Sequence, residues 1–204
     1  MSSGIRFHRL FAYICPMYAL ILENISRYVT LDPREQAHFT AALQHRTLRR
    51  KEFILQEGEL CRYDHFVIKG SLRQYEIDEE GREHIMQFAF EDWWIGDWYS
   101  MLTATPSVYN IDALEDSEVL LIDKNRLDEL FLEIPKLERY FRIIMQHAFV
   151  AQQRRILFLQ KPAEERYADF YSRYGHFEQR VPQQQIASYL GITRETLNRV
   201  KNKQ

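Results

Sequence analysis

The side chains best suited to a chemical task lie near the end of the chain, between residues 194 and 199. Arg194 and Arg199 carry guanidinium groups, each able to donate two hydrogen bonds to O6 and N7 of a guanine. Glu195 can accept a hydrogen bond from N4 of a cytosine. Together on one helix, these residues would read base-pair edges in the major groove of DNA. Asn198 on the same helix also suits contact with bases. Three further residues are placed to contact phosphate oxygens: Thr196, Gln184 and Ser188.

A pair of short helices joined by a tight turn would position these side chains. Gly191 provides the backbone freedom that a sharp turn between helices requires, and Thr193 is placed to cap the second helix. Apolar residues recur at helical spacing on both sides of the turn: Ile186, Leu190, Leu197 and Val200. The pattern predicts a helix-turn-helix.

The charge of the tail agrees with this interpretation. Residues 161–204 hold eight lysines and arginines against five aspartates and glutamates, although the whole chain has a net charge of −2. A basic tail on an acidic body suits contact with phosphate. Ordinary surface charge would also give this excess, and the helix dipole favours Glu195 at the start of any solvated helix. The charge therefore supports DNA contact only together with the helix pattern.

The composition is that of a folded protein with room for one large domain or two modest ones: 204 residues, 46% hydrophobic and 14% aromatic. Cys15 and Cys61 are too few for a disulfide framework or a four-thiolate cluster, so we expect reduced thiols, a cytoplasmic location and no cofactor. No stretch approaches the roughly 20 apolar residues of a membrane span, so no membrane partner is expected. Residues 1–16 show no convincing cleavage site and are interpreted as an N-terminal extension.

Catalytic and metal-binding signatures are missing from the sequence. A cupin metal site needs two histidines one residue apart, and no His-x-His occurs among the seven histidines. No Ser-His-Asp signature, P-loop or Gly-x-Gly-x-x-Gly is present. The sequence therefore predicts no catalytic residues, no metal and no enzymatic activity.

The hydrophobic period divides the chain into a helical, a strand-rich and a second helical part. Residues 17–46 are predicted to form one or two helices, with Asp32 capping a helix that begins at Pro33. Short β-rich runs follow, with turn residues between them and a hairpin at Glu80-Gly81: 52–55, 65–69, 71–77, 84–90, 109–113 and 118–123. These runs predict an antiparallel barrel, sandwich or jelly-roll.

One long helix is predicted over residues 136–160, with a hinge after it at Lys161-Pro162. A heptad-like seam, interrupted by Arg155, runs along this helix and is the expected dimer interface: Leu137, Phe141, Ile144, Ala148, Ala151 and Phe158. A second apolar stripe lies beside the seam. Two stripes favour two partners, the strand domain of the same chain and the same helix of a second chain. The alternative is one wide stripe packed entirely within the monomer.

The order of helices, β-roll, long helix, hinge and helix-turn-helix resembles the Crp/Fnr family of bacterial transcription regulators. Residues 191–199, 67–72 and 79–83 carry the resemblance, which covers roughly residues 20–204. The segment 93–100 and the short tail look like a branch of the family known from Bacteroidetes-type bacteria, which lacks a β-wing. The resemblance implies a homodimer, a palindromic DNA site and an effector-sensing β-roll. A small-molecule effector and RNA polymerase are further candidate partners.

The expected fold class is α+β. It combines an N-terminal antiparallel β-roll of the jelly-roll, cyclic-nucleotide-binding-like type, flanking helices, a long dimerisation helix and a small all-α helix-turn-helix domain. The expected domains are an effector domain over 17–133, the dimerisation helix over 134–160 and the DNA-binding domain over 161–204. The recognition helix of the family uses an Arg-Glu pair and a later Arg, which here are Arg194, Glu195 and Arg199.

The sequence departs from the family where a cyclic nucleotide would bind. Members that bind one use a Gly-Glu near the ribose and a later Arg, followed by Ser or Thr, on the phosphate. Here Gly96-Asp97 stands at the first position, and no arginine or lysine occurs from Glu91 to Ile122. We therefore expect no tight binding of cyclic AMP. The aromatic residues of this region either form a pocket for another effector or fill the nucleotide space. Candidate lining residues are Gly96, Asp97, Trp98, Ser107, Tyr109, Asn110 and His147.

The sequence thus predicts a homodimeric, sequence-specific DNA-binding transcription regulator. The alternative is a cupin-like protein that binds or converts a small molecule and carries a helical tail that does not bind DNA. The spacing of Ala187, Gly191 and Leu197 favours the regulator, because it is the spacing of a helix-turn-helix.

Overall fold

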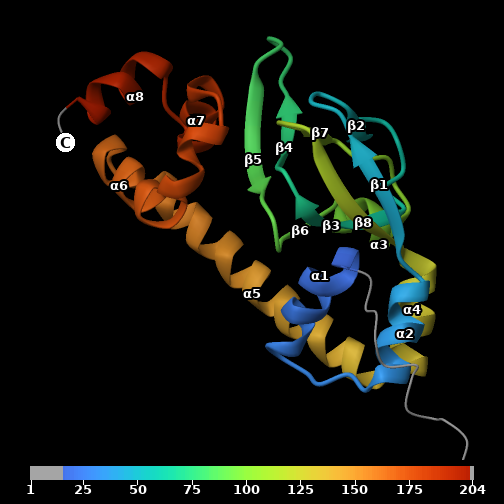
Figure 1. The fold of residues 1–204 in the computed structure, drawn as a ribbon. Helices are drawn as coiled ribbons and strands as arrows, with labels where there is room; N and C mark the ends of the chain where they lie inside the picture. The colour runs from blue at the N-terminus through green and yellow to red at the C-terminus, as the bar shows by residue number, and fades with distance from the viewer. Residues whose placement is uncertain (1–15, 203–204) are drawn as a thin grey trace, which may run out of the picture.

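A computed structural model describes residues 16–202, in which two four-stranded sheets form a β-roll (Figure 1). The strand orders are β1-β8-β3-β6 and β2-β7-β4-β5, and every pairing is antiparallel. The strands are β1 Gln44–Leu48, β2 Phe53–Leu55, β3 Tyr63–Lys69, β4 Leu72–Ile77, β5 Glu83–Ala89, β6 Trp94–Ile95, β7 Asn110–Ala113 and β8 Ser117–Asp123.

The strand β8 shows how the roll is packed, because both of its faces are buried. Val119 and Leu121 point into the roll, where they meet residues of the other sheet such as Leu72 and Ile111. The alternate residues, Leu120 and Ile122, belong to a second core outside the roll. A strand covered on both faces is apolar without interruption, as this one is from Val119 to Ile122.

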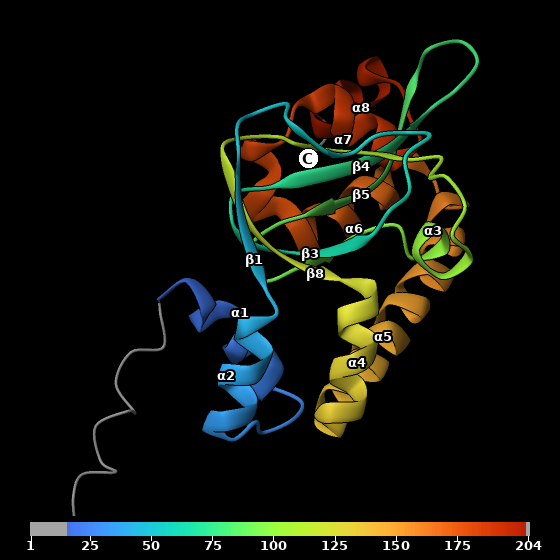
Figure 2. The same ribbon diagram turned by 90° about the vertical axis from the view of Figure 1, so that its right-hand side faces the viewer.

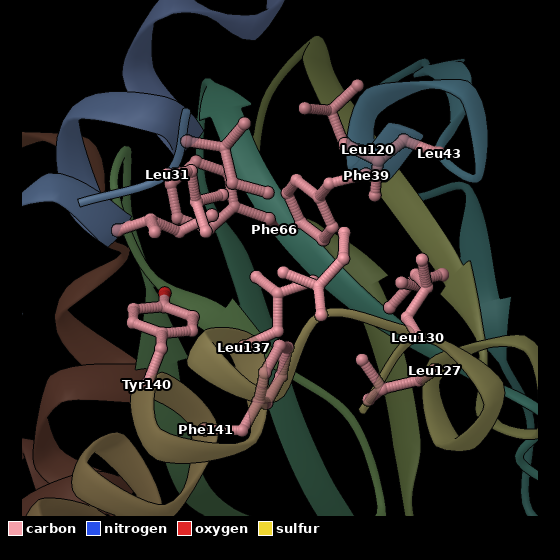
Figure 3. Packing of buried hydrophobic residues seen from close by; sticks show 14 of the residues in the cluster. Leu31, Phe39, Leu43, Phe66, Leu120, Leu127, Leu130, Leu137, Tyr140 and Phe141 are labelled. Carbon is pink, nitrogen blue, oxygen red and sulfur yellow. The ribbon is translucent and has the colours of Figure 1, made fainter. Parts of the chain in front are cut away.

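Four helices cover the outer face of β3 and β8: α1 Pro16–Ser26, α2 Pro33–Ala41, α4 Lys124–Glu133 and the first turns of α5 Pro135–Leu159. Figure 3 shows this core, in which Phe66 of β3 meets Phe39 of α2 and Leu137 of α5. The predicted cap of α2 is confirmed, since Asp32 accepts from the backbone of Arg34 and Glu35 in a capping box.

The helix α5 leaves this core and leads to the C-terminal helices, which return to the roll (Figures 1 and 2). These elements are α6 Ala163–Tyr174, the 3₁₀ helix η1 Gly175–Arg180, α7 Gln183–Leu190 and α8 Arg194–Lys201. The helix α7 lies against β5, on the face of the sheet that points away from the roll interior. The C-terminal helices and the roll therefore share one hydrophobic core.

Some local structure differs from the sequence prediction. Residues 44–46 belong to the strand β1 and not to a helix, because residues 44–48 pair with β8. The strand β6, the helix α4 and the short helix α3 Trp98–Thr103 were not predicted. The predicted N-terminal extension, residues 1–16, lies outside the described residues except for Pro16, which begins α1.

Candidate nucleic-acid interface and sensing site

The turn between α7 and α8 has the geometry that the sequence predicted. Gly191 adopts a left-handed conformation with φ of 64°, and a Cβ there would meet Nη1 of Arg166 at 3.1 Å. That Arg166 nitrogen donates to the carbonyl of Leu190 at 2.6 Å, which satisfies the end of α7. Thr193 caps α8 by accepting from the amide of Thr196 at 3.2 Å. The predicted cap and turn are confirmed.

The helix α8 has one buried and one free face. Leu197 and Val200 are 0% and 1% exposed, so they fix the helix on the domain core. The opposite face carries four exposed polar residues, none of which forms an ion pair with another residue of the range 16–202: Arg194, Glu195, Asn198 and Arg199. The arrangement leaves two guanidinium groups and one carboxylate available to an external partner.

Glu195 is ionised at neutral pH. A hydrogen bond from its own backbone amide and another from the Thr193 hydroxyl hold the pKa of this carboxyl below its ordinary value. An ionised carboxylate accepts hydrogen bonds and donates none, which is the role that cytosine N4 requires.

The three predicted phosphate contacts are placed differently. Gln184 is exposed on α7, and Thr196 is half-buried with its hydroxyl 3.2 Å from that of Thr193. The Ser188 hydroxyl accepts from the amide of Ile85 at 3.0 Å and donates to the carbonyl of Glu83 at 2.7 Å. In this arrangement Ser188 joins α7 to β5, so the expected phosphate contact is not available to it.

A second polar contact between the two parts of the chain was not predicted. The guanidinium of Arg180 donates to Glu91 at 2.8 and 2.9 Å and to Glu115 at 2.6 and 2.9 Å. Nearby, the ring of Phe177 stacks on that of Phe90 with centroids 3.7 Å apart. These pairs are 65 to 89 residues apart in sequence, so no local pattern could have revealed them.

Several residues predicted to line the effector pocket form hydrogen bonds within the fold. Asp97 accepts from the amides of Tyr99 and Ser100 at 3.0 and 3.2 Å and from the hydroxyl of Ser107 at 2.7 Å. Asn110 accepts from the amide of Glu57 at 3.1 Å. These contacts leave the carboxylate and the amide oxygen committed to the fold.

The remaining residues predicted for this pocket also contact other parts of the chain. Gly96 lies where a Cβ would meet Oδ1 of Asp64 at 2.8 Å. Trp98 packs on the core outside the roll, and the Tyr109 amide donates to Ser107. His147 is exposed on α5 with its ring 5.8 Å from that of Tyr28.

A cavity of about 490 Å³ lies instead at the junction of the roll, α5 and the C-terminal helices. Its walls come from β5 and the residues after it, from the second half of α5 and from α6 and α7. Trp93 and Trp94 are the only residues of the aromatic segment 93–100 that line it. The predicted lining residues Gly96, Asp97 and Trp98 do not line this cavity.

The predicted dimer seam on α5 needs correction too. Leu137 and Phe141 are buried in the core of their own chain, and Ile144 packs against the same core. Phe158 packs against the helix-turn-helix core, whereas Ala148 and Ala151 are exposed. The large apolar residues that α5 leaves exposed are others: Phe149 at 64%, Val150 at 47%, Ile156 at 64%, Leu157 at 63% and Leu159 at 44%. The heptad pattern identifies apolar positions, but it does not show whether the same chain or a second copy covers each of them.

Comparison with known proteins identifies the family of this chain. A family model described as cyclic nucleotide-binding domain matches residues 45–133. The transcriptional activator protein anr of Pseudomonas aeruginosa is 30% identical over 167 residues, which are 76% of this chain and 68% of that protein. The chain belongs to the Crp/Fnr family of transcription regulators. Matches to the first relatives span 65 to 68% of their lengths, about two thirds of each.

Solved structures agree with this regulator in fold. FixK2 from Bradyrhizobium japonicum superposes with a TM-score of 0.69 at 21% identity, covering 79% of this chain and 83% of that one. A protein assigned to the Crp/Fnr family from Eubacterium rectale gives 0.64 at 20% identity, covering 85% and 83%. These structures confirm the predicted α+β fold, and the relatives that are transcriptional activators confirm the predicted transcription regulator over the cupin-like enzyme. These relatives give no support to the Bacteroidetes-type branch.

The chemistry of the Asp97 region does not fit a cyclic phosphate. The hydroxyl of Ser107 donates a hydrogen bond to the carboxylate of Asp97, and the segment 91–122 contains no lysine or arginine. No group of three or more metal-ligating side chains occurs among residues 16–202. Within the same range no helix is both long and apolar enough to cross a bilayer.

We expect calorimetric titration with cyclic AMP or cyclic GMP to show no binding in the micromolar range. The segment 91–122 offers no guanidinium fork to hold the cyclic phosphate, and the Ser107 hydroxyl already donates to the Asp97 carboxylate. Inorganic phosphate serves as the control for weak, nonspecific anion heats. A micromolar dissociation constant for either cyclic nucleotide would contradict this prediction.

Proposed function

We propose that this regulator reads a palindromic DNA site as a homodimer, with α8 of each chain in the major groove. The observation that carries the proposal is the free face of α8. Arg194, Glu195, Asn198 and Arg199 are exposed, while Leu197 and Val200 hold the helix rigidly from behind. A helix N-terminus with such side chains is the part that typically enters the groove, so Arg194 and Glu195 stand at the leading end.

The exposed stripe on α5 supports the dimer. Phe149 and Ile156 are seven residues apart and both 64% exposed, so they lie on one line of the helix. Half-buried Met145 precedes them on the same face, and Gln152 lies between them. A second copy of the helix would cover this stripe. The opposite side of α5 faces its own chain through Tyr140.

Two such reading heads would meet DNA at half-sites about 34–36 Å apart, one turn of the duplex, or at a multiple of that spacing. An effector would act by preferring one arrangement of the heads over another. The contacts of Ser188 and Arg180 with the roll offer a route from the sensing part to the reading part. We place the dimer in the cytoplasm, with RNA polymerase as a partner when it activates transcription.

Selection of bound fragments from random DNA tests the proposal directly. We expect a two-fold symmetric sequence to be enriched and its affinity to fall steeply with salt, as counterions are released from the phosphates. Enrichment of a site without symmetry would overturn the dimer, and affinity that does not change with salt would overturn the DNA contact itself.

A further inference from the structure

We propose that the cavity between β5, α5 and the C-terminal helices is the ligand site of this chain. Its occupant would be a small organic anion with a flat, apolar aromatic body. The cavity holds about 490 Å³, a volume typical of small-molecule pockets. It is separate from the Asp97 region, whose side chains are bonded to one another.

Aromatic rings make up much of the wall, and they come from every element around the cavity: Phe88, Trp93, Phe158, Phe170, Tyr174 and Tyr189. Gln87 and Gln152 are the neutral side chains with amide groups that line it. Such a wall offers stacking surface and few hydrogen bonds, so it suits an apolar ring system better than the polar base and sugar of a nucleotide.

Charge distinguishes this cavity from an ordinary hydrophobic pocket. Four cationic side chains line it, and the single carboxylate among its walls, Asp169, is paired with Lys161 at 2.6 Å. Arg154, Arg155 and Arg173 form no ion pair with any residue of the range 16–202. Arg154 and Arg173 are exposed, whereas Arg155 is half-buried beside the aromatic wall, where an anion from outside would compensate its charge.

Arg155 is the strongest of these observations. Its Nη2 donates to the carbonyl of Tyr189, its carbon Cζ lies 3.9 Å from the ring centroid of Tyr189, and its Nη1 is buried without a partner. Burial lowers the pKa of this guanidinium, which shows that its charge is poorly compensated. Because Arg155 lines the cavity, a carboxylate or phosphate of a ligand there would compensate its charge.

The position gives such a ligand a task. It would touch β5, α5 and α6 at once, together with Tyr189 of α7, the helix that precedes α8. Binding would change the contact between the roll and the helix-turn-helix. The ligand site could therefore regulate the proposed DNA binding, but DNA binding does not require it.

The test uses 8-anilinonaphthalene-1-sulfonate, an aromatic anion, on the full chain, with N-phenyl-1-naphthylamine as the same ring system without the sulfonate. We expect one saturable site per chain for the anion, with quenching of tryptophan fluorescence, and about tenfold weaker binding of the neutral dye, because a charged hydrogen bond is lost. Arg155→Gln should weaken anion binding about tenfold. Arg142→Gln, an exposed arginine on α5 outside the cavity, should not.

Ala151→Trp is a second variant, which changes no charge. The larger side chain would fill the cavity from an exposed position of α5. It should abolish dye binding while circular dichroism and melting temperature stay unchanged. Equal affinity for both dyes, or binding unaffected by Ala151→Trp and Arg155→Gln, would overturn the proposal. Displacement of the dye by cyclic AMP would overturn the apolar body. DNA binding measured on the same samples separates this outcome from a failure of the proposed function.

Discussion

Ile156→Asp is expected to convert a dimer into a monomer and to weaken binding to a symmetric operator about 10²–10⁴-fold, because one of two linked contacts is lost. The side chain is 64% exposed in the protomer, so a carboxylate there leaves the chain itself folded. In the dimer the same carboxylate would be buried against its own symmetry copy, where two like charges without partners are strongly unfavourable.

Sedimentation velocity measures the first effect and a fluorescence titration with operator DNA the second. The matched control is Leu132→Asp, the same change at an 85% exposed apolar residue of α4, away from the stripe on α5. A dimer that persists in Ile156→Asp would show that the stripe of Phe149 and Ile156 is not the interface.

Arg194→Ala is expected to reduce affinity for the operator about 5- to 150-fold per half-site, the worth of one bidentate contact with guanine of about 1–3 kcal/mol. Affinity for nonspecific DNA should change little, since it rests on phosphate contacts. The loss is therefore one of sequence preference. Arg194 is exposed and forms no ion pair within residues 16–202, so stability should remain that of the parent chain.

Arg50→Ala is the appropriate control, because it removes an exposed arginine of the roll and changes the net charge equally. Competition of labelled operator with nonspecific DNA gives the ratio of the two affinities. An unchanged ratio in Arg194→Ala would exclude this residue as a reader of bases. The same comparison with Arg199→Ala tests its neighbour on the exposed face.

The helix-turn-helix could be predicted because its signals are local. Gly191, Thr193 and the apolar spacing all lie within one short segment, and each acts on the backbone next to it. The strand β1 could not be found in this way. Its residues Gln44 to Thr47 are exposed and polar, so they show no hydrophobic period, and pairing with β8 alone makes them a strand.

The surroundings of the predicted effector residues could not be predicted for a different reason. Asp97 and Ser107 stand ten positions apart, as ligand-binding residues of the family would, but their side chains bond to each other. The cavity near Arg155 is assembled from β5, α5, α6 and α7, which follow one another only in space. A sequence shows which side chains are present, but it does not show which residues distant in sequence will contact them in the fold.

The shared core between the roll and the helix-turn-helix bears on how such chains can be recombined. Phe88 and Phe90 of the roll pack on Tyr189 and Phe177 of the C-terminal helices, and Ser188 hydrogen-bonds to the backbone of β5. C-terminal helices grafted from a relative would keep these contacts only if they carried aromatic rings at 177 and 189 and a hydroxyl at 188. We therefore expect a working chimera to need the outer face of β5 together with α7.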